Sequence, residues 1–334
     1  MNRLVILAPN WLGDAVMALP AIADVRRAAP AASISVAARA SVAPLFALVR
    51  EVNDTLVIER DAAHVLAAKN FDTALLLPNS TRAALVARRS RIPERWGYRT
   101  GWRGALLTRA IPPARGLHQI EYYQHLVQAL GFPNGPIEPS VTVSTAIHAT
   151  GRQLLASSGW DGRMPLVAIA PGAAYGGAKR WPPAYFAELI DGLASDGVQC
   201  VMVGTAADAA TAADVLHSHT RGDAAAILNL VGRTDLSTLA GVLASCRALV
   251  TNDSGAMHLA AAIGIPVTAM FGPTNERATA PRTTNDEPRT TNDPIVLTSP
   301  VWCRPCMLRE CPLDHRCMRG IGVSAVLEAA RSAL

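Results

Sequence analysis

Lysine is almost absent from this chain, since two of its 334 residues are lysine and 29 are arginine. Aromatic residues are also scarce, at 5%, so the chain lacks the stacking positions of a single-stranded RNA-binding surface, and we expect no nucleic-acid partner. No apolar run approaches the ~18 residues of a membrane-spanning helix. The motifs G-x-G-x-x-G, G-x-S-x-G and H-E-x-x-H are missing, which disfavours dehydrogenases, hydrolases and metalloproteases.

The composition is that of a globular protein, with 50% hydrophobic and 17% charged residues. A chain of this length is expected to form two domains, and we place them at residues 1–158 and 159–334. The first twenty residues do not form a signal peptide, because Asn10 and Asp14 interrupt their apolar segment. We expect a cytoplasmic protein.

The net charge of +5 is concentrated in the first domain. Residues 1–158 carry 17 basic and 10 acidic residues, and the segment Arg82–Arg115 holds nine arginines with a single acid, Glu94. Guanidinium groups bind phosphate and carboxylate in bidentate fashion, so this segment indicates an acidic partner. An anionic lipid headgroup is one candidate, and nucleic acid is another that the scarcity of aromatic residues disfavours. The alternative is a solvated arginine-rich surface.

Short apolar runs alternate with helical segments along the whole chain, which predicts an α/β fold with doubly wound parallel sheets. Two such units would enclose a ligand cleft between Rossmann-like halves. A near-duplicate sequence at 281–294 is polar and Pro-rich, so it is interpreted as a surface loop. The predicted strands cover 3–8, 33–37, 55–58, 73–77, 167–170, 199–203, 227–230, 248–251 and 267–271, and the predicted helices include 15–29, 146–157 and segments starting near 82, 182 and 255.

A polar cluster follows the predicted strand 248–251, where α/β sheets bind ligands. Asp253 or Ser254 can cap the helix that begins near Gly255, and the free amides of its first turn attract anions. His258 lies four residues after Ser254, on the same helical face. The cluster is therefore a candidate ligand site, with helix capping alone as the alternative.

A Gly-rich turn follows the strand 167–170. The glycines of Gly172–Gly177 let backbone amides approach a phosphate, and Lys179 with Arg180 supplies positive charge. The turn is not a nucleotide-hydrolysing P-loop, because Ala178 precedes the lysine and no Ser or Thr follows it. We expect it to bind a diphosphate; a tight turn with an incidental lysine is the alternative.

Two acidic residues follow other predicted strands. Asp208, after Gly204 and Thr205, can bind ribose hydroxyls or cap a helix. Asp14 begins the first predicted helix, where it can be a general base or an acid stabilised by the helix dipole.

Four cysteines, Cys303, Cys306, Cys311 and Cys317, cluster near the end of the chain, with His315 between the last two. This spacing makes a structural zinc site one interpretation. It is tighter than that of usual zinc fingers, so reduced thiols or a redox-labile site are the alternatives.

The motifs in both halves resemble those of the ADP-heptose:lipopolysaccharide heptosyltransferases, glycosyltransferase family 9. The resemblance covers nearly the whole chain, and three of the motifs (Pro-Asn-Ser, Thr-Gly-Trp-Arg-Gly and Ala-Lys-Arg-Trp-Pro) point to the members that add the second core heptose. The motifs lie at 10–14, 19–20, 78–80, 100–104, 171–173, 178–182, 252–258 and 271–274.

The resemblance implies a GT-B fold, with two Rossmann-like domains facing across a cleft, and inverting transfer that requires no metal cofactor. Asp14 would deprotonate the acceptor hydroxyl, and Lys179 would stabilise the departing ADP. The second domain would hold ADP-heptose and the first a heptosyl-Kdo-lipid A acceptor, with peripheral contact to the inner face of the cytoplasmic membrane. The implied donor ligands are Gly172, Ala173, Arg180, Gly204, Thr205, Asp208, Asp253, Ser254, Gly255 and His258, and the implied acceptor ligands are Asn10, Asn79, Ser80, Arg99 and Arg103.

Three other functions are weighed against this one. The same scaffold could transfer the first or third heptose, or another sugar. A nucleotide-sugar 2-epimerase would need no acceptor pocket, so the arginine-rich first half counts against it. A non-enzymatic nucleotide-sensing or RNA-binding module is suggested only by the basic isoelectric point of about 9.1.

Overall fold

The computed structural model describes residues 1–219, 227–282 and 293–334. Its contacts divide the chain into unit 1, Met1–Thr142, and unit 2, Val143–Leu334. This boundary precedes the predicted one at 158/159 because helix α6 (Thr145–Ser157) packs on α9 (Leu236–Leu243) of unit 2. A β-carbon on Gly151 would lie 2.2 Å from the carbonyl carbon of Gly241. The two helices therefore touch through their backbones, which only glycine allows at these positions.

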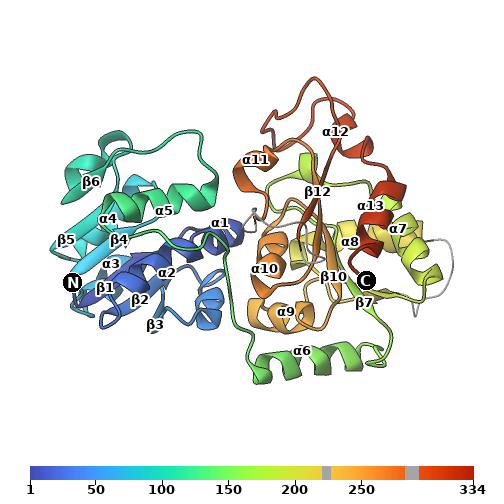
Figure 1. The fold of residues 1–334 in the computed structure, drawn as a ribbon, viewed down its shortest axis with the longest axis horizontal. Coiled ribbons are helices and arrows are strands. Elements are labelled where there is room, and N and C mark those ends of the chain that lie inside the picture. Colours follow the sequence, from blue (N-terminus) through green and yellow to red (C-terminus); the bar gives the residue numbers. More distant parts are fainter. Residues whose placement is uncertain (220–226, 283–292) are drawn as a thin grey trace. The chain divides into compact units, whose positions relative to one another are not determined.

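Unit 1 is a six-stranded parallel sheet in the order β3-β2-β1-β4-β5-β6, with helices between the strands (Figure 1). Its strands are β1 (Arg3–Leu7), β2 (Ser33–Ala38), β3 (Asp54–Val57), β4 (Thr73–Leu76), β5 (Glu94–Tyr98) and β6 (Arg109–Ile111). Its helices are α1 (Leu12–Met17), α2 (Leu19–Ala28), α3 (Ala62–Ala67), α4 (Thr81–Arg89) and α5 (Gln119–Ala129), with 3₁₀ turns η1 (Ala43–Leu48) and η2 (Gly101–Leu106).

Unit 2 repeats this topology, with the order β12-β11-β10-β7-β8-β9. Its strands are β7 (Leu166–Ala170), β8 (Gln199–Met202), β9 (Ile227–Asn229), β10 (Ala248–Asn252), β11 (Val267–Phe271) and β12 (Ile295–Thr298). Its other helices are α7 (Pro183–Ser195), α8 (Ala209–Ser218), α10 (Gly255–Ile263), α11 (Glu276–Thr279), α12 (Arg316–Arg319) and α13 (Val323–Arg331), with 3₁₀ turns η3 (Gly177–Lys179) and η4 (Ala206–Asp208).

All nine predicted strands are confirmed to within one or two residues, and so is the doubly wound α/β class. The predicted helix 15–29 is wrong as a single element, because the chain breaks between α1 and α2 at Ala18, just before Pro20. Most of the duplicated segment 281–294 lies outside the described residues. Within the part of the chain that is described, no helix has both the length and the apolar character to cross a bilayer.

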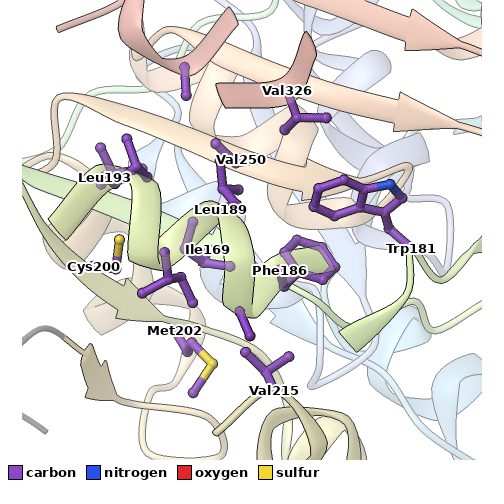
Figure 2. Close-up of a cluster of buried hydrophobic side chains, with 14 of the residues drawn as sticks. Ile169, Trp181, Phe186, Leu189, Leu193, Cys200, Met202, Val215, Val250 and Val326 are labelled. Carbon is purple, nitrogen blue, oxygen red and sulfur yellow. The ribbon is translucent and has the colours of Figure 1, made fainter. Parts of the chain in front are cut away.

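The core of unit 2 is built between α7, α8, α13 and the central strands (Figure 2). Phe186 and Leu189 of α7 lie with Ile169 of β7 and Val250 of β10 in one cluster of fully buried side chains. Trp181 joins this cluster, and its indole N–H donates to the carbonyl of Ile321 at 2.9 Å. Trp181 ends the Gly-rich turn that follows β7, which is called the Gly-rich loop (residues 171–181) from here on. The end of this loop is therefore anchored in the hydrophobic core.

In each sheet the direction of winding reverses beside the first strand of the unit. In unit 1 this switch point lies between β1 and β4, and in unit 2 between β7 and β10. Loops that leave the carboxyl ends of such a pair diverge to opposite faces and open a crevice where ligands bind. The sequence placed its candidate site residues after the predicted strands 3–8, 73–77, 167–170 and 248–251. These strands are β1, β4, β7 and β10, so the candidate residues lie at the two switch points.

Candidate functional sites

Asn252, the last residue of β10, fixes both ends of the Gly-rich loop at the switch point of unit 2. The amide nitrogen of its side chain donates to the backbone carbonyls of Pro171 (2.8 Å) and Gly172 (3.3 Å). The side-chain oxygen Oδ1 accepts from the backbone N–H of Trp181 at 3.0 Å. Asn252 is fully buried, so these bonds are shielded from water. The loop is thereby closed onto the end of β10.

Lys179 and Asp253 form an ion pair at this switch point. The ammonium nitrogen lies 2.5 Å from Oδ2 of Asp253, and the same oxygen accepts from the hydroxyl of Thr274 at 2.6 Å. Lys179 is 9% exposed and Asp253 7%, so both charges are largely withdrawn from solvent. The Lys179 ammonium also lies 4.7 Å from the ring centre of Tyr175. A cation is therefore held in a defined place beside the start of α10.

The prediction that Asp253 or Ser254 caps α10 through its side chain is wrong. Ser254 occupies the N-cap position, but the cap forms no side-chain hydrogen bond, and its hydroxyl lies 3.0 Å from that of Thr251. Asp253 is engaged by Lys179 and Thr274. Within the described residues, the first-turn amides of α10, which begins at Gly255, thus have no side-chain cap, and such amides attract anions.

The other predicted donor residues of unit 2 lie around these loops. Ala173 and His258 are buried, His258 in the first turns of α10. Arg180 is half-buried, and among the described residues its Nε has no hydrogen-bond partner. A negatively charged ligand group would satisfy that donor.

Asp208 has a local structural role that the sequence left open. One carboxylate oxygen accepts from the backbone N–H (2.9 Å) and the hydroxyl (2.8 Å) of Thr205. A β-carbon on Gly172 would lie 2.1 Å from the other oxygen, and one on Gly204 would lie 3.1 Å from Asp208. The two glycines make room for the carboxylate, so Asp208 connects the loops after β7 and β8. Its contact with ribose stays a prediction.

Asp14 and Asn79 occupy the corresponding switch point of unit 1. Asp14 lies in the first turn of α1, is partly exposed, and its charge adds to burial in raising the pKa of the Tyr123 phenol on α5. The side-chain amide of Asn79 donates to the hydroxyl of Tyr122 at 2.9 Å, and the backbone carbonyl of Asn79 accepts from the hydroxyl of Thr100 at 3.0 Å. The turn after β4 is therefore held by Tyr122 of α5 and by Thr100, the residue before η2.

Asn10 follows β1 and Ser80 follows Asn79 in the chain, and both are exposed. The Ser80 hydroxyl accepts from the backbone N–H of Ala83 at 3.2 Å, so Ser80 is the N-cap of α4. This bond uses one of the two lone pairs of the hydroxyl oxygen and leaves its proton available.

The two arginines predicted to contact an acidic ligand differ in position. Arg99 is exposed, whereas Arg103 is 0% exposed and one of its terminal nitrogens donates to the carbonyl of Pro78 at 2.5 Å. Burial lowers the pKa of Arg103. The buried position of Arg103 does not support direct contact with a ligand at the surface. Arg103 instead stabilises the Pro78–Asn79 turn through its hydrogen bond to the Pro78 carbonyl.

The four clustered cysteines do not assemble a metal centre in the described part of the chain, where no three His, Cys, Asp or Glu side chains are arranged to hold an ion. Cys306 is exposed, Cys303 and Cys311 are half-buried, and Cys317 is buried, which raises the pKa of its thiol. The geometry thus gives no support to the structural zinc site.

Three contacts of the site were not predicted from the sequence. They are Thr274 on Asp253, Tyr122 on Asn79, and Tyr175 beside Lys179. Thr274 ends the Phe-Gly-Pro-Thr motif, so its place after a strand was a usable signal. The two tyrosines carried no signal, because their roles depend on the packing of distant segments.

The family model of Glycosyltransferase family 9 (heptosyltransferase) matches residues 60–316. Lipopolysaccharide heptosyltransferase 2 of Salmonella typhimurium is 32% identical over 305 residues, covering 84% of this chain and 85% of that protein. Lipopolysaccharide heptosyltransferase 3 of Escherichia coli is 25% identical over 297 residues, covering 83% and 84%. The solved structure of E. coli ADP-heptose lps heptosyltransferase II has a TM-score of 0.84 and 31% identity, covering 100% of this chain and 98% of that one.

Proposed function

The chain belongs to glycosyltransferase family 9, and we propose that it transfers heptose from ADP-L-glycero-D-manno-heptose to the heptosyl-Kdo-lipid A inner core of lipopolysaccharide. It is a glycosyltransferase with the GT-B fold, its two units each a doubly wound sheet. The observation that carries the proposal is the buried Lys179–Asp253 pair at the switch point of unit 2, next to the uncapped start of α10. The arrangement suits a diphosphate.

The proposed reaction inverts the configuration at the anomeric carbon of the transferred heptose. The acceptor oxygen forms a bond to this carbon while the bond to the ADP oxygen breaks, and Asp14 takes the proton of the acceptor hydroxyl. Lys179 and the first-turn amides of α10 stabilise the negative charge that develops on the leaving diphosphate. These protein groups would supply the charge stabilisation that a metal ion supplies in other transferases.

Addition of the second heptose is favoured over addition of the third by the degree of similarity. Identity is 32% to the Salmonella heptosyltransferase 2 and 25% to the E. coli heptosyltransferase 3, over comparable lengths. Transfer of the first or third heptose remains the alternative within the family. Acceptors that differ by one heptose distinguish these activities.

The function is tested by transfer from ADP-heptose to purified core acceptors that carry no, one or two heptoses, with and without a chelator. We expect product only from the acceptor with one heptose, at a rate that the chelator does not change. Preference for the acceptor without heptose would assign the first transfer instead, and loss of activity with the chelator would contradict metal independence.

Contact with an anionic membrane is proposed for the surface formed by α4 and η2, which pack together. Arg82, Arg88 and Arg89 of α4 are exposed, and Trp102 of η2 is 91% exposed. Arginines attract anionic headgroups by about 1 kcal/mol each, and tryptophan prefers the membrane interface. Such a surface would bring the enzyme to a lipid-anchored acceptor.

We expect co-sedimentation with vesicles of anionic lipid to fall at least tenfold when the three α4 arginines are replaced by glutamine. Trp102→Ala is expected to weaken binding as well, whereas Trp302→Ala serves as a control because Trp302 is an exposed tryptophan of unit 2. Equal binding of the triple variant and the wild type would exclude this surface.

Arg99→Glu is expected to raise the acceptor KM by about ten- to a hundredfold, because a charge-assisted hydrogen bond to an acidic core group would be lost. The donor KM should stay unchanged. Arg163→Glu, an exposed charge reversal in unit 2, is the matched control. An unchanged acceptor KM would remove Arg99 from the proposed site.

A further inference from the structure

The cysteine-rich segment, residues 303–317, holds the Gly-rich loop from one side. The carbonyl of Arg309 accepts from the backbone N–H of Ala178 at 2.9 Å, and Oε1 of Glu310 accepts from that of Gly177 at 3.0 Å. The Tyr175 hydroxyl donates to the carbonyl of Met307 at 2.7 Å. Three hydrogen bonds thus fix the turn that ends in Lys179.

The same segment also holds the turn after β11. Nε of Arg304 donates to the carbonyl of Gly272 at 3.0 Å, and a terminal nitrogen of Arg304 lies 2.8 Å from the Glu276 carboxylate. The backbone N–H of Met307 donates to the carbonyl of Pro273 at 2.9 Å. This turn leads to Thr274, whose hydroxyl binds Asp253.

The segment therefore bridges the two loops that converge on the Lys179–Asp253 pair. Lys179 comes from the first loop, and Thr274, which binds Asp253, from the second. Loops fixed before a ligand arrives lose less conformational entropy on binding and keep their donors aimed at the developing charge. Without the bridge, the ligand itself would have to order both loops.

We propose that the cysteine-rich segment is a clamp for the diphosphate site and that Glu310 and Arg304 are its positioning residues. The inference rests on the proposed function in taking ADP-heptose as the ligand. Glu310 and Arg304 act on the ligand through Gly177 and the 272–274 turn. The segment thereby receives a role that does not require a metal.

Titration of the purified protein with ADP tests the clamp. We expect Glu310→Ala to raise the Kd for ADP about tenfold, because the Gly177 amide loses its side-chain acceptor. Glu310→Gln should bind nearly as the wild type does, since its amide oxygen can still accept that bond. Arg304→Ala should weaken ADP binding by a similar factor or more.

Arg316→Ala is the matched control within the segment. The Arg316 side chain pairs with Asp314 and lies over the ring of Trp302. In steady-state assays, Glu310→Ala should raise the donor KM while the acceptor KM stays constant. An unchanged Kd in Glu310→Ala, equal losses in the Ala and Gln variants, or an equal loss in Arg316→Ala would overturn the clamp.

Hydrogen exchange separates the clamp from the proposed function. Without ligand, the amides of Gly177 and Ala178 should exchange faster in Glu310→Ala than in the wild type and in Arg316→Ala. If the wild type does not bind ADP, the proposed donor is wrong, while the exchange rates still decide whether Glu310 fixes the loop. Unchanged exchange at both amides would overturn the clamp by itself.

Discussion

Asp14→Asn is expected to lower kcat by about 10²- to 10⁴-fold, the usual contribution of a general base. Asparagine has nearly the same shape as aspartate but cannot take the proton of the acceptor hydroxyl. The first turn of α1 should persist, because the cap of α1 depends on backbone bonds such as that from Ala15 to the carbonyl of Trp11. The loss should therefore be chemical and not structural.

Single-turnover transfer measured at saturating donor and acceptor gives the rate of the chemical step directly. The Kd for ADP should remain that of the wild type, because the proposed diphosphate ligands are residues of unit 2. Asp61→Asn, an exposed carboxylate just before α3 in the same unit, is the control and should be fully active. Near-wild-type turnover of Asp14→Asn would remove Asp14 from the role of base.

Much of the fold was predictable because the central strands are continuous apolar runs. The strands β1, β4, β7 and β10 are almost wholly buried, and burial on both faces of a parallel sheet produces such runs. The strands β5, β6 and β12 were missed. β6 and β12 are edge strands with partly exposed residues, and β5 begins with Glu94 and Arg95, so their sequences lack the apolar signal.

The positions of the site residues were predictable, but their contacts were not. Topology places residues after β7 and β10 at one switch point, whatever their side chains do. The sequence offered Asp253 or Ser254 as the cap of α10, because capping preference is a local property. The structure gives the Asp253 carboxylate to Lys179 and Thr274, which are 74 and 21 residues distant in the chain. A buried ion pair of this kind depends on loops that meet only in the folded protein.

The contacts of the cysteine-rich segment were not predictable from the sequence either. Its spacing suggested a metal site, while its contacts lie with Gly177, Ala178 and the 272–274 turn. These contacts are made largely by backbone groups and by Arg304 and Glu310, none of which forms a recognisable spacing motif. Backbone hydrogen bonds between distant loops leave no pattern in side-chain identity.

Lys179→Met is expected to lower kcat by about 10²- to 10³-fold, since an electrostatic contact to the developing diphosphate charge would be lost. It should also destabilise the protein, because the Asp253 carboxylate is largely buried and would lose its cation while it keeps the Thr274 hydroxyl. Removal of one partner of a buried ion pair typically costs about 3 kcal/mol or more.

The double variant Lys179→Met/Asp253→Asn separates these two effects. Asn at 253 removes the buried charge and can still accept a bond from Thr274, so thermal unfolding should return toward the wild-type Tm. Activity should stay low, because the cation is still missing. Asp253→Asn alone, which keeps the ammonium, should lose less activity than either variant without Lys179. If the double variant recovered turnover together with stability, Lys179 would be a structural partner of Asp253 and another cation would have to stabilise the leaving diphosphate.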